Sequence, residues 1–66
     1  MKLDQTKIQI LEHLAKGLTA KEISKETSIS VPMIKYITRQ LRIEIGLKNN
    51  IELALWFNAY QKIVQS

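Results

Sequence analysis

The stretch from Ser30 to Gly46 most constrains the fold of this chain, because it carries its own helix start and stop signals. Ser30 can cap the first N–H groups of a helix, and Pro32 is tolerated in the first turn, where its missing N–H has no partner. Gly46 can take the left-handed conformation that ends a helix. The sequence therefore predicts a helix over residues 31–45.

This predicted helix has two chemically different sides. Apolar residues recur at spacings of three and four, which at about 100° per residue places them on one side. They are Ile34, Ile37, Leu41 and Ile45. Lys35, Arg39 and Arg42 fall on the other side. An apolar back and a cationic front suit a helix that enters a DNA groove, and the alternative is a basic face that is only solvated.

Composition restricts the chain to one small domain. Its 66 residues include no cysteine, which excludes a disulfide framework and a thiolate metal site, so the core must hold the fold alone or with a second subunit. No apolar run approaches the ~18 residues of a membrane span, and Asp4 and Glu12 interrupt any signal-like stretch. We expect residues 1–66 to form a single domain of a soluble, cytoplasmic protein.

The charge balance favours a polyanionic partner, since ten Lys and Arg against six Asp and Glu give a net charge of +4. Two Gly and one Pro leave little room for hairpins, so we expect an all-α fold. We expect no enzyme, cofactor or metal site, because the sequence has no nucleophile with a nearby base and no ligand cluster or Gly-rich phosphate loop. Membrane binding is not expected either, since the cations are spread over several segments.

Two shorter helices are predicted ahead of the cationic one. Asp4 can cap a helix over about residues 5–16, whose apolar stripe ends before Gly17. Residues Thr19 to Glu22 match a capping box, which predicts a second helix over about residues 20–26. A short helix, a turn of three or four residues and a longer basic helix form the helix-turn-helix arrangement.

Asn49 and Glu52 again match a helix start, and they predict a fourth helix over about residues 50–63. This helix is apolar on two sides. One stripe contains Leu53, Ala54, Phe57, Tyr60 and Val64, and the other contains Leu55, Trp56, Ala59 and Ile63. A domain of this size can cover only one stripe. Either the helix frays or Trp56 folds back over the surface, or the second stripe meets another copy of the chain; we favour a homodimer.

Taken in order, without insertion or deletion, these residues resemble the LuxR/FixJ/GerE family of helix-turn-helix DNA-binding domains, from Leu3 to Val64. The resemblance is carried by Leu3, Ile10, Leu11, Leu14 to Thr19, Lys21 to Ser24, Ile29, Ser30, Ile34, Lys35, Leu41, Gly46 to Asn49 and Glu52. Ile51 to Phe57 is especially similar to the NarL branch. Because Met1 directly precedes the opening residues of the family, we expect a free-standing protein of the GerE type rather than an excised domain.

The resemblance implies a four-helix fold that places the helix 31–45 in the major groove and dimerises through the helix 50–63. It implies base contacts from Lys35, Tyr36 and Arg39, and phosphate contacts from Thr19, Lys21, Ser30, Val31, Arg42 and Lys48. The implied dimer surface is Leu55, Trp56, Ala59 and Ile63. The chemistry agrees, because Lys35 and Arg39 lie one turn apart and can donate to guanine O6 and N7.

The implied protein is a bacterial transcriptional regulator associated with the nucleoid. Its expected partners are double-stranded DNA and a second copy of itself, with RNA polymerase or another regulator as a further partner. The alternative is a small protein-interaction module that pairs with another regulator through the fourth helix.

Several positions depart from the family pattern. The family usually has Thr where this chain has Met33, and His or a similar residue where it has Ile37. Leu and Gly are usual at Thr27 and Ser28, Arg is usual at Asn50, and an acidic residue is common where the first helix has Lys7 or Gln9. Met33 lacks the hydroxyl that would contact a phosphate. We therefore expect this chain to read a different site from that of typical members.

Overall fold

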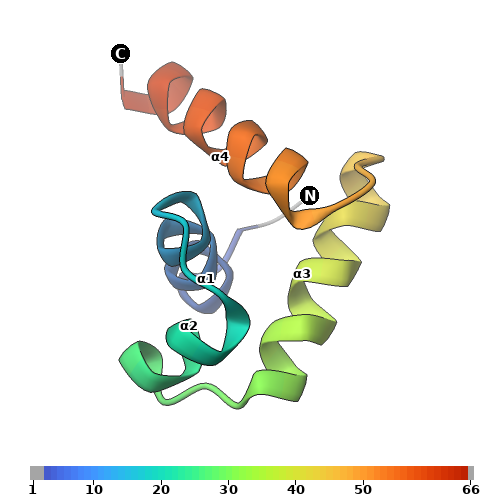
Figure 1. Ribbon diagram of the computed structural model, residues 1–66. Coiled ribbons are helices and arrows are strands. Elements are labelled where there is room, and N and C mark those ends of the chain that lie inside the picture. The colour runs from blue at the N-terminus through green and yellow to red at the C-terminus, as the bar shows by residue number, and fades with distance from the viewer. Residues whose placement is uncertain (1–2, 66) are drawn as a thin grey trace.

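The computed structural model describes residues 3–65, which form four helices and no strand (Figure 1). The helices are α1 (Gln5–Ala15), α2 (Ala20–Thr27), α3 (Val31–Ile45) and α4 (Asn50–Gln65). The predicted all-α class is confirmed. The bounds of α3 are those expected, whereas α1 ends one residue earlier, α2 one residue later and α4 two residues later than predicted.

The predicted capping residues make the expected hydrogen bonds. Asp4 Oδ1 accepts from the Lys7 N–H at 2.9 Å, and Ser30 Oγ accepts from the Met33 N–H at 3.3 Å. Thr19 forms the full capping box of α2. At the other end of α3, Gly46 has a φ of 89°, the left-handed conformation anticipated there. Local sequence signals therefore fix where these helices begin and end.

The core lies where the four helices meet, and α1 packs against each of the other three. It consists of Ile10, Leu11, Leu14, Ile23, Ile34, Leu41, Leu53 and Phe57. In Figure 1, α2 lies beside the N-terminal end of α3, and α4 starts near its C-terminal end and crosses α1. One side of α3 therefore faces the core, and its opposite side is left uncovered. No helix within residues 3–65 has both the length and the apolar character needed to span a membrane.

The turn between α2 and α3 contains a left-handed serine. Ser28 has a φ of 63°, and its N–H donates to the Ser24 carbonyl at 2.9 Å. The Thr27 hydroxyl bridges the turn, because it donates to the Ile23 carbonyl at 2.7 Å and accepts from the Ile29 N–H at 3.2 Å. These hydrogen bonds hold a conformation that suits glycine better than serine.

We expect Ser28→Gly to raise the free energy of unfolding by about 0.5–1 kcal/mol, because glycine removes the steric cost of the left-handed conformation but gains more entropy in the unfolded chain. Ser24→Gly is the matched control. Since Ser24 lies inside α2, its replacement should lower the free energy of unfolding by about 0.5 kcal/mol. Urea unfolding followed by circular dichroism measures both values. Equal destabilisation by the two variants would contradict a strained Ser28.

Candidate nucleic-acid interface

The rotation of α3 about its own axis is fixed by its buried side. Ile34 and Leu41 belong to the core, as the apolar spacing predicted, and Ile37 and Ile45 are partly buried against it. Thr38 is also buried, with 2% of its surface exposed, and its hydroxyl donates to the Lys35 carbonyl at 3.2 Å. The burial of Thr38 was not predicted, because a polar residue does not count in an apolar pattern. Its position between Ile34 and Leu41 on the same side is the signal that could have revealed it.

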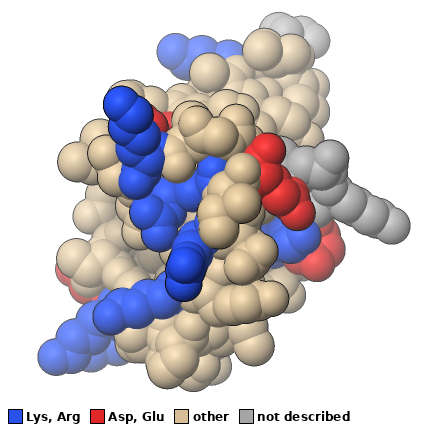
Figure 2. All heavy atoms as spheres, turned by 90° about the vertical axis from the view of Figure 1, so that its right-hand side faces the viewer, with Lys and Arg blue, Asp and Glu red and all other residues tan. Residues whose placement is uncertain are grey.

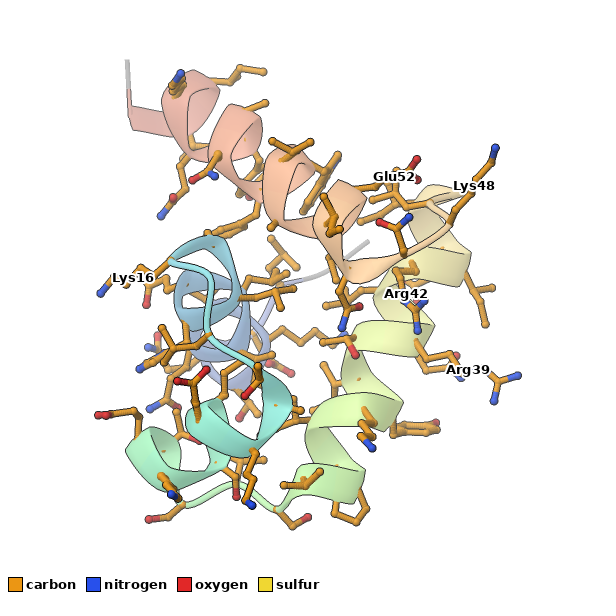
Figure 3. The ribbon with its side chains drawn as sticks, viewed as in Figure 1. Lys16, Arg39, Arg42, Lys48 and Glu52 are labelled. Atoms are coloured by element: carbon orange, nitrogen blue, oxygen red, sulfur yellow. The ribbon has the colours of Figure 1, made fainter. Side chains whose placement is uncertain are left out.

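The uncovered side of α3 carries the cations that were predicted to read bases. Lys35 and Arg39 are exposed and lie one turn apart. Figure 2 shows Lys and Arg side chains along one side of this face, and uncharged side chains through its middle. In Figure 3, Arg39 extends away from the body of the protein, whereas Lys16 points to the opposite side of the molecule. The face therefore presents hydrogen-bond donors at positions that packing leaves free to approach a ligand.

Large apolar side chains share this uncovered face. Tyr36 is 61% exposed and Met33 is 49% exposed, and Ile43 is exposed further along the helix. Tyr36 also lines a shallow hollow of about 220 Å³ between α1 and α3, together with Lys7 and Glu44. Only Tyr36 of these apolar residues was predicted as a base contact. Met33 and Ile43 also lie on this face, although neither was predicted as a base contact.

The predicted phosphate contacts Thr19 and Ser30 are both helix caps. The Thr19 hydroxyl accepts from the Glu22 N–H at 3.2 Å, and each capping hydroxyl keeps a hydrogen of its own that can donate to a phosphate. The Thr19 N–H donates to Glu22 at 2.9 Å, and this bond is the main cause that lowers the pKa of Glu22. Lys21 is exposed in the first turn of α2, and Val31 is partly buried at the start of α3. These residues place donors beside two helix N-termini, where free N–H groups favour anions.

Arg42 forms part of the joint between α3 and α4, a role the sequence did not reveal. It is partly buried, and its Nη1 donates to the Lys48 carbonyl at 3.4 Å. Its buried Nε has no hydrogen-bond partner among the described residues. The Lys48 N–H donates to Glu52 at 2.7 Å, and the Glu52 N–H donates to Asn49 Oδ1 at 2.9 Å. In Figure 3 the Lys48 side chain extends outward at this joint. That Arg42 and Lys48 contact phosphates stays a prediction.

The predicted dimer surface on α4 is mostly uncovered. Leu55 is 65% exposed, Ile63 is 76% exposed and Ala59 is exposed as well. Trp56 differs from the other three, because it is partly buried against the core and its ring stacks on Tyr60 with centroids 5.2 Å apart. Ile51, which sequence reasoning missed, is exposed one turn before Leu55. The spacing of four residues from Ile51 through Leu55 to Ala59 was the available signal.

An apolar groove lies beside this surface. It has a volume of about 560 Å³ and runs between α4 and the turn that connects α1 to α2. Leu18 lines it from the turn, and Ile51 and Leu55 line it from α4. The groove makes the uncovered part of α4 continuous with the end of α1, so the apolar surface is wider than one helix face.

Comparison with known proteins supplies the family. A sequence model described as bacterial regulatory proteins of the luxR family matches residues 1–57, which include α1, α2, α3 and the first half of α4. No curated protein and no solved structure matches the chain significantly. The family match covers the helix-turn-helix and the cationic face of α3, and it points to a DNA-binding regulator. The chain belongs to the luxR family of bacterial regulatory proteins.

Proposed function

We propose that this chain, acting as one domain over residues 1–66, is a sequence-specific regulator of transcription that binds double-stranded DNA. The observation that carries the proposal is the position of Lys35 and Arg39, which stand exposed on α3 while the opposite side of this helix is locked into the core. An α-helix fits the major groove, and Lys or Arg donates to guanine O6 and N7 there. We therefore place α3 in the major groove, with Lys35, Tyr36 and Arg39 at the base edges.

Phosphate contacts would hold α3 in register. Thr19, Lys21, Ser30 and Val31 lie at the N-terminal ends of α2 and α3, and Arg42 and Lys48 lie at the C-terminal end of α3. Contacts at both ends of a recognition helix fix its orientation on the duplex without reading sequence. The protein would then act in the cytoplasm, on the nucleoid, and could contact RNA polymerase or another regulator once bound.

We further propose that two copies pair through α4. The exposed side chains of Leu55, Ala59 and Ile63 form the surface, with Trp56 at its edge. Burial of such residues against a symmetry mate would remove apolar area from water, which is the main driving force for association. A homodimer would present two copies of α3 to two half-sites of an operator.

Enrichment from a pool of random duplexes tests the proposal directly. The whole chain is incubated with the pool, bound duplexes are recovered over several rounds, and their sequences are compared with those recovered without protein. We expect paired, inverted half-sites that contain guanine. Retention of all duplexes with equal strength, lost on addition of salt, would show that the net charge alone binds DNA and would contradict sequence reading.

Leu55→Glu tests the pairing of two copies. Since Leu55 is exposed, we expect the variant to stay folded, to sediment as a monomer and to bind a duplex with two half-sites about a hundredfold more weakly, because avidity is lost. Its affinity for a single half-site should not change. Leu55 is a better test position than Trp56, because a charge at the partly buried Trp56 would also disturb the core.

Val64→Glu is the matched control for Leu55→Glu, because Val64 is an exposed apolar residue of the same helix outside the proposed dimer surface. It should leave both sedimentation and DNA binding unchanged. Analytical ultracentrifugation with and without duplex measures the outcome. A wild-type chain that remains monomeric both free and on a two-half-site duplex would contradict pairing through α4.

The apolar groove supports a second candidate function, a protein-interaction module that pairs with another regulator. Its walls, together with Leu55, offer a continuous apolar surface that a helix of a different protein could cover. The two functions separate in the enrichment experiment: a module of this kind enriches no motif, whereas a regulator that reads DNA does.

A further inference from the structure

The uncovered face of α3 has an uncharged part at its N-terminal end. Met33 and Tyr36 are one turn apart, and their side chains are 49% and 61% exposed. Residues three apart on a helix are neighbours, with about 5–6 Å between their Cβ atoms. They therefore form a small apolar patch at the N-terminal end of α3, and Tyr36 lies one turn before Arg39 on the same face.

The direction of the patch is fixed by the structure. The Met33 N–H is held by the Ser30 hydroxyl, and Ile34 and Leu41 anchor the opposite side of α3 in the core. Neither Met33 nor Tyr36 can turn inward without displacing these anchors. In a helix the Cβ atoms tilt towards the N-terminus, so the Met33 side chain lies over the first turn of α3. The N-terminal residues of a recognition helix are those that reach base edges.

The chemistry of the patch selects its target. Methionine has no hydrogen-bond donor and only a weakly accepting sulfur, so Met33 has little to offer a phosphate. The groups exposed in the major groove are hydrogen-bond donors and acceptors, with one apolar exception, the C5-methyl group of thymine. An apolar side chain at the groove edge gains free energy by covering this methyl group, because both lose contact with water.

Resting on the proposed function, we infer that Met33, together with the ring of Tyr36, reads a thymine methyl group beside the base pairs contacted by Lys35 and Arg39. Met33 thereby becomes a specificity-determining residue. The half-site then combines two kinds of recognition, namely guanine by donated hydrogen bonds and thymine by apolar contact.

Replacement of thymine by uracil tests this inference, because it removes the methyl group and leaves base pairing intact. Each thymine of the enriched half-site is replaced in turn, and binding is measured by fluorescence anisotropy. We expect one position at which wild type binds about fourfold more weakly to uracil, the value for loss of one buried methyl-sized group. Met33→Ala should bind the thymine duplex correspondingly more weakly and show no further loss with uracil.

Two control variants distinguish the loss of a DNA contact from the loss of folded structure. Met33→Leu keeps an apolar side chain of similar size and should keep its sensitivity to uracil. Val64→Ala removes an exposed apolar group from α4 and should behave like wild type on both duplexes. Because Met33 and Val64 are exposed, none of these changes is expected to unfold the protein, which circular dichroism can verify.

The experiments distinguish failure of the thymine contact by Met33 from failure of the proposed function. If a motif is enriched but no thymine-to-uracil change weakens wild type, the methyl inference is overturned while the proposed function stands. If Met33→Ala remains as sensitive to uracil as wild type, the methyl group is read by a different residue and the role of Met33 is overturned. If no motif is enriched at all, both the inference and the proposed function fail.

Discussion

Simultaneous replacement of Lys35 and Arg39 by Ala is expected to abolish discrimination between the enriched site and random DNA. A bidentate contact to the correct base contributes about 1–3 kcal/mol of discrimination, so loss of two contacts corresponds to at least about thirtyfold. The helices should remain folded, because both side chains are exposed and neither belongs to the core. The salt dependence should also flatten, because two fewer cations close to the DNA release fewer counterions.

The matched control for this variant is Lys16→Ala with Lys25→Ala. It removes the same number of positive charges from positions outside α3. Both lysines are exposed, and Lys16 points away from the face that carries Arg39 (Figure 3). Anisotropy titrations of both double variants on the enriched and a scrambled duplex, at several salt concentrations, measure affinity and discrimination separately. A Lys35/Arg39 variant that still prefers the enriched site would show that α3 is not the reading helix.

Phe57→Ala is expected to leave the chain largely unfolded. Phe57 is 2% exposed in the core, and truncation of a buried Phe costs about 3–5 kcal/mol. A domain of this length has a free energy of unfolding of roughly 3–10 kcal/mol in total, so the loss consumes most of it. Thermal unfolding followed by circular dichroism measures the loss of stability. Measurements at several protein concentrations show whether this loss depends on the pairing of two copies.

Val64→Ala serves as the control for Phe57→Ala, because Val64 belongs to the same predicted stripe of α4 but is exposed. Its replacement should change the free energy of unfolding by no more than about 0.5 kcal/mol. A Phe57→Ala variant that is nearly as stable as wild type would mean that α4 can leave the domain without loss of the core, and the packing of α4 on α1 would then be wrong.

The helices could be predicted from the sequence because their limits depend on local chemistry. Ser30, Pro32 and Gly46 act within one turn of the chain, and the Thr19 capping box closes between residues three apart. The end of α4 was less predictable. Its sequence contains no terminating glycine or proline after residue 50, so the helix continues to Gln65 beyond the expected residue 63.

The candidate site was only partly predictable, because burial depends on residues distant in sequence. The exposure of Lys35 and Arg39 followed from the spacing of the apolar residues around them. Trp56 was assigned to the free stripe of α4, whereas the structure packs it partly against the core and stacks its ring on Tyr60. The contact of Arg42 with the Lys48 carbonyl depends on the turn of the chain after α3, which no local pattern describes.

The joint at Arg42, Lys48 and Glu52 has a consequence for the proposed pairing of two copies on DNA. Glu52 lies in the first turn of α4 and Arg42 in the last turn of α3, so hydrogen bonds tie the end of one helix to the beginning of the next. In the proposed dimer through α4, this joint would set the distance between the two α3 helices. Such a protein would measure the distance between half-sites as strictly as it reads the bases within them, and an operator with one base pair added at its centre would no longer fit.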